Sequence, residues 1–399
     1  MQCVLLAAGM GKRMWPLTAT RPKVMIPIAN RPMLAHLVSA AAGAGFDDIV
    51  CVVGYREEAV RSYFGKGERC GVKISYVVQR SQRGTGDALL SAEHLLEDEF
   101  VLLNGDMLLS EEDLRRISGT GGVCMGLAEV EDPKEYGVVE VEADRITGLY
   151  EKTPNPPTNL INAGAYRLDA RIFGYLRTCP VSERGEVELT DALQEYIRSG
   201  ELQAMLLSSW MDIGQPWNVL DANALCMDHM ETKVSGTVEE NVILHGPVVV
   251  KEGAVVKSGT YIEGPCIIGE NCRIGPHAYI RGSTAIGANC HIGHSVEVKN
   301  SVIFPNTNIP HFNYVGDSVI GSGCNLGAGT KVANLRHDNR SVRVGSQDTK
   351  RRKFGAVIGD DVLFGINCSV NVGAAIGRGA RIGPHSYVSG IVGEDAIIR

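Results

Sequence analysis

Residues 262–298, IEGPCIIGENCRIGPHAYIRGSTAIGANCHIGHSVEV, carry an aliphatic side chain at every sixth position. Neither the helix period near 3.6 residues nor the strand period of 2 produces this spacing. A triangular solenoid does, because each step of six residues forms one short strand and one turn, and every sixth side chain then points inward. Glycine follows several of these residues, as at Gly269 and Gly287, where a tight corner favours it. The stretch predicts a left-handed parallel β-helix.

The same repeat covers most of the second half of the chain. It is interrupted between Ala333 and Ala356, where ANLRHDNRSVRVGSQDTKRRKFGA cannot continue the coil and is expected to project as a loop. The apolar repeat positions are Val238, Leu244, Val250, Val256, Ile262, Ile268, Ile274, Ile280, Ile286, Ile292 and Val298, then Ile320, Leu326 and Val332, and finally Ile358, Phe364, Val370, Ile376, Ile382 and Val388.

The first half of the chain has a different pattern, in which short apolar runs alternate with helical periodicity. Such alternation predicts an α/β domain with a mostly parallel sheet covered on both faces, and ligands then bind beyond the carboxyl ends of its strands. We expect this domain at residues 1–216, a helical linker at 217–235 and the β-helix at 236–399, with the loop at 333–356. The expected strands are Cys3–Ala7, Ile49–Val53, Lys73–Val78 and Phe100–Leu103, and the expected helices lie around Met33–Ala44, Glu57–Phe64 and Asp87–Leu96.

Composition and charge narrow the function. The 399 residues carry a formal net charge of -7, so a nucleic acid is an unlikely partner, because proteins that bind one usually present a basic face. No apolar stretch is long enough to cross a bilayer, and the chain begins with a strand-like segment where a signal peptide would stand. The 11 cysteines form no CxxC pair, which gives no support to a zinc site or a disulfide framework. A cytoplasmic protein without a membrane partner is expected.

Residues 5–32, LLAAGMGKRMWPLTATRPKVMIPIANRP, hold the strongest chemical signal. Glycines after a strand let backbone N–H groups approach phosphates, and an arginine adds a bidentate positive charge. The whole string resembles the sugar-1-phosphate nucleotidyltransferases, which join a sugar-1-phosphate to a nucleoside triphosphate and release pyrophosphate. The resemblance implies a Rossmann-like nucleotidyltransferase domain. The alternative is a strand–loop–helix unit with incidental glycines.

The resemblance also assigns roles to later residues. Arg13 and Lys23 would neutralise charge on the phosphates, and Asp106 and Asp212 would bind Mg²⁺, which prefers hard carboxylate ligands beside phosphates. Without that context, each aspartate would be only a cap or a turn. The implied nucleotide-binding residues are Leu6, Ala8, Gly9, Gly11, Gln79, Gly84 and Thr85, and the implied sugar-phosphate-binding residues are Gly137, Glu151, Lys152 and Asn162.

Polar residues within the β-helix resemble the acetyltransferase half of bacterial bifunctional N-acetylglucosamine-1-phosphate uridylyltransferases. Acetylation of an amino sugar needs a neutral amine, so a histidine is a suitable general base, and the resemblance gives this role to His311. Arg281 and Lys299 would hold the sugar phosphate, and Tyr314 and Asn325 would orient the sugar or the tetrahedral intermediate, with acetyl-CoA along the coil. Ala328 and Asn334 complete the implied acetyltransferase site.

Two departures shift the resemblance toward archaeal bifunctional sugar-1-phosphate nucleotidylyltransferase/acetyltransferases. Asn334 is followed by LRHDNR where the bacterial enzymes carry a Tyr-Asp-Gly segment, and the sequence ends at Arg399 without their C-terminal extension. The segment WMDIGQPW at 210–217 is more similar to glucose-1-phosphate thymidylyltransferases. UTP and dTTP therefore both remain candidate nucleotides, and glucosamine-1-phosphate and galactosamine-1-phosphate both remain candidate acetyl acceptors.

The resemblance implies a homotrimer or a multiple of one, because β-helices of this class commonly associate as trimers with sites at subunit interfaces. Two other functions remain open at this stage. The chain could be a monofunctional pyrophosphorylase whose β-helix is a trimerisation scaffold. It could also be a non-catalytic regulatory subunit with the same two-domain layout, although the joint presence of Gly9–Arg13, Lys23 and Asp106 disfavours this.

Overall fold

The computed structural model describes residues 1–182 and 185–399. The chain forms two compact units. The first comprises Met1–Met10, Pro22–Met25 and Met33–Asp212, and the second comprises Gly11–Arg21, Ile26–Pro32 and Ile213–Arg399. The early part of the chain therefore contributes residues to both units. Among the described helices, none has both the length and the apolar character that a membrane crossing requires.

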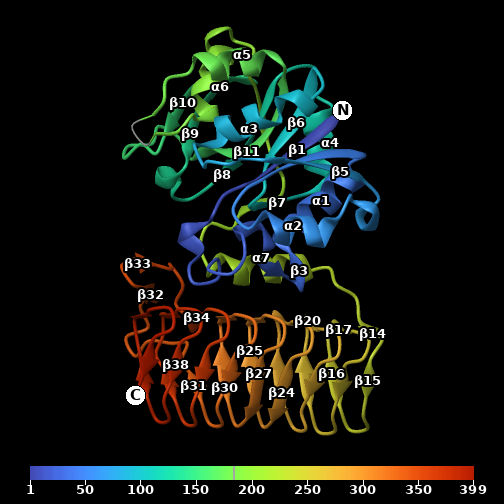
Figure 1. The fold of residues 1–399 in the computed structure, drawn as a ribbon, viewed down its shortest axis with the longest axis vertical. Coiled ribbons are helices and arrows are strands. Elements are labelled where there is room, and N and C mark those ends of the chain that lie inside the picture. Colours follow the sequence, from blue (N-terminus) through green and yellow to red (C-terminus); the bar gives the residue numbers. More distant parts are fainter. Residues whose placement is uncertain (183–184) are drawn as a thin grey trace. The chain divides into compact units, whose positions relative to one another are not determined.

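The first unit is built on a nine-stranded sheet in the order β5-β4-β1-β6-β11-β8-β12-β10-β9 (Figure 1). The four strands expected from sequence are present, and they pair in parallel in the order β5-β4-β1-β6. The expected helices are present between them. The bounds are β1 Gln2–Ala7, α1 Met33–Gly43, β4 Asp48–Val53, α2 Glu57–Phe64, β5 Lys73–Val78, α3 Thr85–Ala92, β6 Glu99–Asn104, β7 Met107–Leu109 and α4 Glu111–Ser118.

The expectation of a mostly parallel sheet is wrong for the other half of this sheet. There β11 runs antiparallel to both β6 and β8, and β10 runs antiparallel to β9 and β12. The reason is the connection lengths, because β9 and β10 are joined by a tight hairpin and a parallel pair would need a long crossover. The bounds are β8 Cys124–Glu129, β9 Gly137–Glu142, β10 Arg145–Glu151, β11 Leu160–Asp169, α5 Arg171–Thr178, α6 Leu189–Arg198, β12 Gln203–Leu206 and β13 Trp210–Asp212.

Helices cover both faces of this sheet, as expected. Side chains of β1 alternate between two apolar cores, with Cys3 and Leu5 in one and Val4 in the other. The first core also contains residues of α1, α2 and α4, and the second contains residues of α3, α5 and α6. Because both faces are buried, the polar ends of the strands are the places where ligands can reach the sheet.

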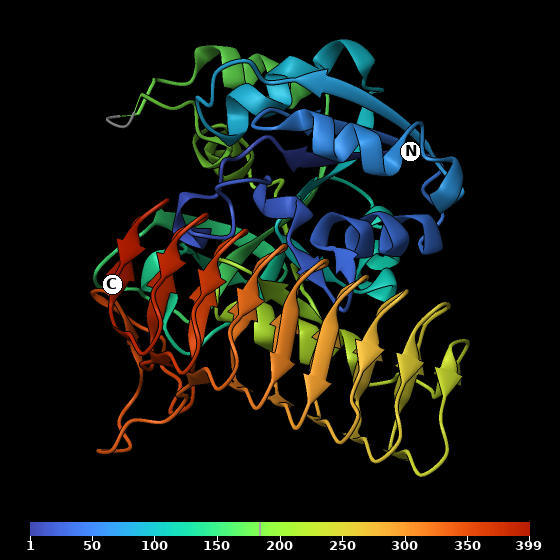
Figure 2. The ribbon, with the colours of Figure 1, turned by 60° about the horizontal axis from the view of Figure 1, so that its bottom comes forward.

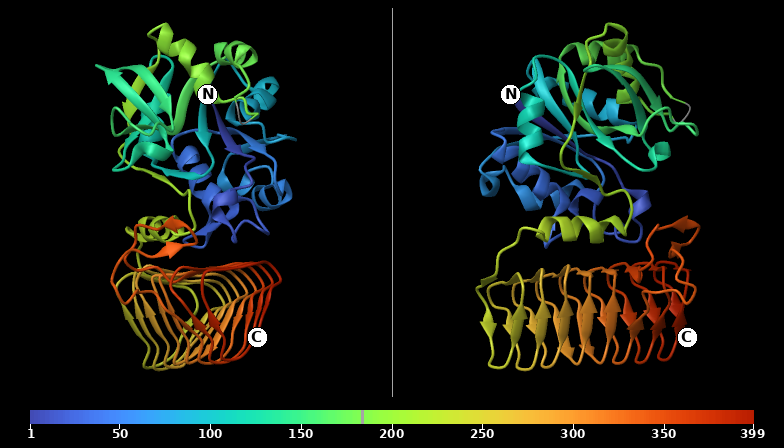
Figure 3. Two further views of the ribbon diagram at one scale, coloured as in Figure 1. Left: turned by 90° about the vertical axis from the view of Figure 1, so that its left-hand side faces the viewer. Right: turned by 180° about the vertical axis from the view of Figure 1, so that it is seen from behind.

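The second unit is a coil of three parallel sheets, in which each strand pairs with the strand one coil further along (Figures 2 and 3). We name the sheets by their first strands. The β14 sheet contains β14 Lys233–Val234, β17 Val248–Val250, β20 Cys266–Ile268, β23 Thr284–Ile286, β26 Val302–Ile303, β29 Val319–Ile320, β34 Ala356–Ile358, β37 Ala374–Ile376 and β40 Ile391–Val392. The β15 sheet contains β15 Thr237–Val238, β18 Val255–Val256, β21 Arg273–Ile274, β24 His291–His294, β27 Asn308–His311, β30 Asn325–Leu326, β35 Leu363–Phe364, β38 Arg381–Ile382 and β41 Ile397–Ile398. The β16 sheet contains β16 Ile243–His245, β19 Tyr261–Glu263, β22 Tyr279–Arg281, β25 Glu297–Lys299, β28 Tyr314–Gly316, β31 Lys331–Val332, β36 Ser369–Val370 and β39 Tyr387–Val388.

The apolar repeat fills the interior of this coil. The repeat residues from Val250 to Val388 all belong to one continuous buried core, and Val238 and Leu244 pack against it. Asn271, Asn289 and Asn306 stand at successive turns with positive φ, a conformation that asparagine tolerates better than most side chains. The coils also approach closely, since a Cβ added to Gly293 would lie 1.8 Å from the carbonyl oxygen of Pro310.

The segment 333–356, which interrupts the repeat, leaves the coil and then rejoins it. Within 333–356, β32 (Arg343–Val344) and β33 (Gln347–Asp348) form a small antiparallel ribbon. The coil then resumes in register, because β34 pairs with β29 and β35 pairs with β30. The segment is therefore an insertion between two consecutive coils.

The remaining parts of the second unit pack along the β14 sheet. Helix α7 (Asn218–Met227) contacts β23, β26 and β2 (Pro27–Ile28), and β2 pairs with β3 (Arg31–Pro32) (Figure 3). Thr20 and Arg21 both donate hydrogen bonds to the Asp360 carboxylate, and the Arg21 guanidinium lies 4.8 Å from the centre of the Phe304 ring. The end of the Gly11–Arg21 segment is thus held by coil side chains.

Candidate active sites

Neighbouring segments of the same chain approach the backbone closely at the carboxyl end of β1. The Gly105 amide donates to the Leu6 carbonyl at 2.9 Å, and a Cβ on Gly105 would lie 2.7 Å from that oxygen. The Ala8 carbonyl accepts from the Tyr55 amide at 3.2 Å and from the Gln82 side chain at 2.8 Å. Glycine at position 105 is therefore required for this close packing, and it places the next residue, Asp106, at this edge of the sheet.

Asp106 and Asp212 are brought together by a two-stranded ribbon. Strand β13 pairs antiparallel with β7 so that Asp212 stands opposite Met107, the residue after Asp106. The Lys23 ammonium donates to Asp106 Oδ2 at 2.6 Å, and the Lys23 side chain is only 8% exposed whereas that of Asp106 is 35% exposed. A buried cation bound to one aspartate, with a second aspartate on the adjoining strand, is an arrangement suited to phosphates and a divalent cation.

Three of the expected nucleotide-binding residues, Gln79, Gly84 and Thr85, lie after the end of β5 and around the start of α3. The Gln79 side-chain amide donates to the Gly84 carbonyl at 3.1 Å and to Asp87 Oδ2 at 2.9 Å. Gly84 has φ +97°, and a Cβ there would lie 2.5 Å from the Val187 carbonyl. Thr85 begins α3, and its hydroxyl accepts from the Leu189 amide at 3.2 Å. With both amide protons of Gln79 engaged, its side-chain oxygen is oriented to act as an acceptor.

The glycine-rich loop lies partly in the second unit. Gly9 has open space around its Cβ position, and Gly11 has φ +69° at the start of a 3-10 turn over Lys12–Met14. The Gly11 carbonyl accepts from the Met14 amide at 2.9 Å and from the Thr18 hydroxyl at 3.1 Å. Arg13 is exposed within this turn. The sequence therefore folds into a compact turn that presents a positive side chain to solvent.

The residues expected to contact the sugar converge on the hairpin of β9 and β10 and the neighbouring strand β11. Glu151 stands opposite Gly137, and a Cβ on Gly137 would lie 3.1 Å from Glu151 Oε2 and 3.6 Å from the Asn162 Cβ. Lys152 follows Glu151 with a positive φ of 47°, and its amide donates to the Tyr136 carbonyl at 3.1 Å. The structure thus brings Gly137, Glu151 and Asn162 into one cluster.

Tyr166 joins this cluster and was not predicted from sequence. Its hydroxyl is hydrogen-bonded to the Asn162 side chain and lies near the Glu151 charge, and burial raises the pKa of Tyr166 well above its usual range. Tyr166 stands four residues after Asn162 on β11, beyond a register shift of the strand. In a regular strand, residues four apart share a face but lie about 13 Å from each other along the strand, so the sequence alone would not have placed these two side chains in contact.

Arg281, Lys299 and Tyr314 all lie on strands of the β16 sheet. Arg281 stands opposite Lys299 in register, and Glu297 stands opposite Tyr314. Arg281 Nη1 donates to Glu297 Oε1 at 3.0 Å, and this ion pair raises the pKa of Arg281 above its usual value. Among the described residues, the buried Arg281 Nε has no hydrogen-bond partner.

Asp317 links several members of this site and was not predicted from sequence. Its Oδ2 accepts from the Lys299 ammonium at 3.3 Å and from the Asn334 side chain, and its Oδ1 accepts from the Asn300 side chain at 2.7 Å. The Asp317 side chain is only 5% exposed. A Cβ on Gly316 would lie 2.6 Å from both the Tyr314 hydroxyl and the Asn334 amide, so the glycine leaves room for these two side chains to meet.

His311, Asn325 and Ala328 are placed on the neighbouring β15 sheet and its corner. His311 ends β27 and is exposed, and no hydrogen bond of its imidazole occurs within residues 1–182 and 185–399. Asn325 pairs with Asn308, at the opposite end of β27 from His311. Ala328 lies in the turn between β30 and β31. Within one chain, therefore, the structure does not bring the His311 and Asn325 side chains into contact with Arg281 or Lys299.

Comparison with known proteins connects both halves of the chain to one family. Residues 2–229 match the nucleotidyl transferase family, and residues 262–373 match the GMPPB C-terminal domain. A protein named bifunctional protein GlmU from Methanococcus maripaludis strain C7 is 44% identical over 405 residues, which cover 100% of this chain and 97% of that protein.

Two further comparisons support the same grouping. A bifunctional sugar-1-phosphate nucleotidylyltransferase/acetyltransferase from Sulfurisphaera tokodaii is 41% identical over 403 residues, covering 98% of each chain. A crystal structure from Bacillus anthracis, assigned as a glucose-1-phosphate thymidylyltransferase, has a TM-score of 0.54 and 30% identity. It covers 58% of this chain and 98% of its own, so that likeness extends over only part of the sequence.

Proposed function

Because the chain belongs to the family of bifunctional sugar-1-phosphate nucleotidylyltransferase/acetyltransferases, we propose that it acetylates an amino-sugar-1-phosphate and then converts the product to a nucleotide sugar. The acetyl donor is acetyl-CoA and the acceptor is glucosamine-1-phosphate or galactosamine-1-phosphate. UTP or dTTP then supplies the nucleotidyl group, with N-acetylglucosamine-1-phosphate or glucose-1-phosphate as acceptor. The observation that carries the second reaction is the buried Lys23 bound to Asp106 beside Asp212.

Nucleotidyl transfer requires neutralisation of charge more than covalent participation of the protein. A sugar phosphate oxygen attacks the α-phosphorus of the triphosphate, the bond from that phosphorus to the bridging oxygen breaks, and pyrophosphate leaves with the electron pair. We assign Arg13 and Lys23 to the negative charge that develops on the phosphates. Lys23 is suited to this role because its burial strengthens its electrostatic interaction with a nearby phosphate.

Asp106 and Asp212 have the chemistry that Mg²⁺ requires. Magnesium is usually held by one or two carboxylates together with phosphates and water, and Asp212 on β13 stands opposite Met107, the residue after Asp106. Such an ion would supply positive charge to the triphosphate. In this arrangement Lys23 would exchange Asp106 for a phosphate oxygen when the nucleotide binds.

Recognition of the two substrates is assigned to separate groups. The free side-chain oxygen of Gln79 is suited to accept the N3–H of a pyrimidine, a donor that uracil and thymine share. The close-packed turn at Gly84 and Thr85 would back the nucleotide, together with Leu6, Ala8, Gly9 and Gly11. Gly137, Glu151 and Asn162 would bind sugar hydroxyls, and Lys152 would meet the sugar phosphate.

Acetyl transfer is assigned to the coil. The neutral amine attacks the thioester carbonyl carbon, a C–N bond forms and the C–S bond breaks. His311 accepts the amine proton, and the departing sulfur takes a proton to leave as the thiol of CoA. Arg281 and Lys299 are suited to the sugar phosphate, and Tyr314, Asn325, Ala328 and Asn334 to the sugar and the tetrahedral intermediate.

The separation of His311 from Arg281 within one chain supports a shared site between subunits. We propose a homotrimer or a multiple of one, in which His311 of one subunit acts on a sugar held by the β16 sheet of another. We also propose that the coil is left-handed and that the domains divide at 1–216, 217–235 and 236–399. The 333–356 insertion, which carries Lys350 to Lys353, would contribute to a neighbouring site.

One assay separates this function from the two alternatives. The purified protein is incubated with glucosamine-1-phosphate, acetyl-CoA, Mg²⁺ and either UTP or dTTP, and release of CoA thiol and of pyrophosphate is measured. The variant His311→Ala should lose thiol release by about 100-fold or more while pyrophosphate release from N-acetylglucosamine-1-phosphate is retained. The variant His385→Ala, which removes an exposed histidine elsewhere on the coil, is the matched control.

The outcomes discriminate clearly. No thiol release from the wild-type protein with either amino sugar would leave a monofunctional pyrophosphorylase with a scaffold coil. Absence of both products would indicate a regulatory subunit. Equal thiol release from the wild type and His311→Ala would remove His311 from the mechanism.

A further inference from the structure

A polar cavity of about 350 Å³ lies at the end of the first unit's sheet where β6, β8, β10 and β12 begin and β11 ends. At the opposite end of the sheet, β1 and β6 end and Asp106 stands. A strand of six residues spans about 20 Å, so the cavity is remote from the proposed nucleotidyl transfer site. Its charged lining consists of Glu99, Arg145, Arg167, Asp169, Arg171 and Glu201.

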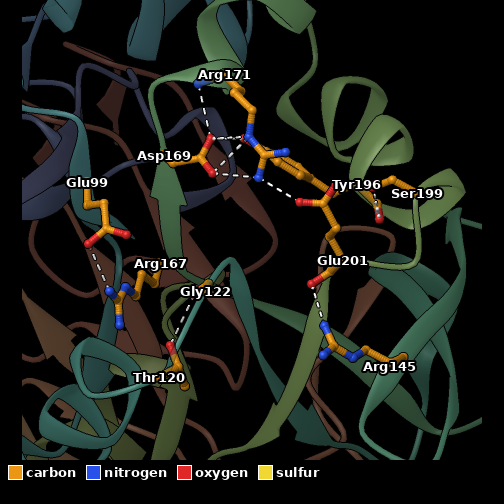
Figure 4. Close-up of polar contacts among 10 residues, drawn as sticks. All are labelled: Glu99, Thr120, Gly122, Arg145, Arg167, Asp169, Arg171, Tyr196, Ser199 and Glu201. Atoms are coloured by element: carbon orange, nitrogen blue, oxygen red, sulfur yellow. Dashed lines mark hydrogen bonds and ion pairs between the residues drawn. The ribbon is translucent and has the colours of Figure 1, made fainter.

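The three carboxylates of the cavity are already paired (Figure 4). Arg171 Nη2 donates to Asp169 Oδ2 at 2.8 Å and to Glu201 Oε2 at 2.7 Å. Asp169 Oδ1 also accepts from the Tyr196 hydroxyl at 2.7 Å, and Glu99 accepts from Arg167 Nη2 at 2.9 Å. Two arginines therefore pair with all three acids, and Arg145 supplies the third positive charge of the lining.

Arg145 is the arginine of the cavity lining that forms no ion pair with the carboxylates of Glu99, Asp169 or Glu201. Its Nη1 donates to the backbone carbonyl of Glu201 at 2.7 Å. Its carboxylate partner is its sequence neighbour Asp144, 3.8 Å from Nε and 74% exposed. The buried Nε of Arg167 lacks a hydrogen-bond partner among the described residues, and Gln203 also lines the cavity. Arg145 and Arg167 therefore both have N–H groups that can donate to a ligand in this part of the cavity.

We propose that this cavity is a second ligand site, which binds the phosphate group of a small phosphorylated metabolite. An arginine fork matches phosphate oxygens in pairs. Gly121 and Gly122 leave the adjoining wall without side chains, and a Cβ on Gly121 would meet no atom within 4 Å. The volume lies at the lower end of the range for small-molecule pockets, which suits a phosphate ester better than a whole nucleotide sugar.

The strands of the cavity connect it to the residues assigned to the sugar. Strand β10 begins at Arg145 and ends at Glu151, and β11 contains Asn162 and ends at Asp169. A ligand that shifts Arg145 or Asp169 would therefore act on the two strands that carry sugar contacts. The effect on catalysis rests on the proposed function and is reciprocal, because two coupled sites change each other's affinity by the same factor.

The test measures binding directly. Isothermal titration of the full-length protein is carried out with orthophosphate and with glucose 6-phosphate, in the presence of excess nucleotide sugar to occupy the catalytic site. Arg145→Gln should weaken binding by about tenfold or more, since it removes a charged hydrogen-bond donor. Gln203→Leu, which leaves Arg145 intact, should weaken it less. Arg177→Gln removes an exposed arginine paired with Glu93 outside the cavity and should bind as the wild type does.

The two probes distinguish the sources of phosphate. Tighter binding of the ester identifies a metabolite as the ligand, and equal binding identifies free phosphate. Failure of both probes to bind the wild type, or equal affinity of the wild type and Arg145→Gln, would overturn the site. Because the titration does not depend on turnover, loss of binding in Arg145→Gln would support the site even in a protein that transfers no nucleotide.

Discussion

Asp317 is the residue on which the proposed acetyltransferase site depends most. It accepts hydrogen bonds from Lys299, Asn300 and Asn334 while almost completely buried. A buried carboxylate of this kind fixes the positions of the cations around it, and its removal leaves those donors unpaired. We therefore regard Asp317 as a positioning residue for the sugar phosphate.

Asp317→Asn should lower thiol release by raising the KM for the amino-sugar-1-phosphate about tenfold, because Lys299 loses its charged partner. The kcat should change less, since His311 is untouched, and pyrophosphate release should be retained. Steady-state kinetics of both reactions measure this split. Asp338→Asn, an exposed aspartate paired with Arg336 in the insertion, is the control. An unchanged KM in Asp317→Asn would show that Asp317 does not position Lys299.

The sequence named candidate members of the sites but not the contacts between them. Lys299 and Asn334 were both assigned to the acetyltransferase site, but Asp317 joins them only because consecutive coils stack and bring distant residues into register. Tyr166 was missed for a different reason, since it lies four residues beyond Asn162 on β11, across a register shift that the sequence pattern does not reveal. Both omissions concern packing between strands, which the periodicity of one strand does not specify.

At the scale of elements, the coil was predictable and half of the sheet was not. The repeat of six residues defines an inward position wherever it occurs, so the buried core follows it closely. In the first unit, helical crossovers predicted the parallel strands β5, β4, β1 and β6. Beyond β6 the strands are joined both by a hairpin and by helices, namely α4 before β8 and α5 and α6 before β12. Local apolar patterns do not distinguish parallel from antiparallel partners.

Because consecutive coils stack closely, a methyl group added at one glycine of the coil should lower stability, whereas a methyl group added at another should not. Gly293→Ala should destabilise the coil by several kcal/mol, because the new Cβ would lie 1.8 Å from the Pro310 carbonyl oxygen and backbone cannot move aside easily. Gly393→Ala, at a position with nothing within 4 Å, is the matched control and should be neutral. Thermal unfolding followed by circular dichroism compares them, and similar melting temperatures for both variants would contradict the stacking.

Helix α4 predicts a pH-dependent contribution to stability. Ser110 caps the helix by accepting from the Asp113 amide, and the buried Asp113 carboxylate accepts from the Ser208 and Ser209 amides. Burial alone would raise the pKa of Asp113, but these hydrogen bonds lower it overall. A lowered folded-state pKa stabilises the protein above the unfolded value near 3.9, and this stabilisation is lost as pH falls through the folded pKa.

Asp113→Asn should therefore cost about 2–3 kcal/mol of unfolding free energy at neutral pH, and the difference from the wild type should shrink in acid. Urea unfolding at several pH values measures it. Glu112→Gln, an exposed change in the same helical turn, should leave stability unchanged at every pH. A difference that grows on acidification would contradict the assigned sign.

At the scale of the whole molecule, the second unit includes residues that precede most of the first. Thr20 and Arg21 donate to Asp360, whose other oxygen accepts from the Ser322 amide at 2.8 Å, and Asn30 donates to the Ile286 carbonyl at 2.6 Å. The turn that carries Arg13 is continuous with this anchored segment. The coil is therefore expected to influence nucleotidyl transfer through the chain segment that it holds.

Asp360→Asn should reduce pyrophosphate release about tenfold, because the segment bearing Arg13 becomes less well positioned, and thiol release should be unchanged. Asp395→Asn, an exposed aspartate at another turn of the coil, is the control. Measuring both products from one preparation separates loss of position from loss of fold, since an unfolded coil would release neither. Equal pyrophosphate release in both variants would contradict the influence of the coil.

The contact between Arg21 and Asp360 has a consequence for inheritance. Two positions separated by most of the sequence must remain compatible in every descendant, so a replacement at one favours a compensating replacement at the other. Recombination that exchanged the amino-terminal half for that of a distant homologue would break such pairs. Compared across many relatives, positions 21 and 360 should therefore covary, and surviving natural chimaeras should have their junctions outside the interval between them.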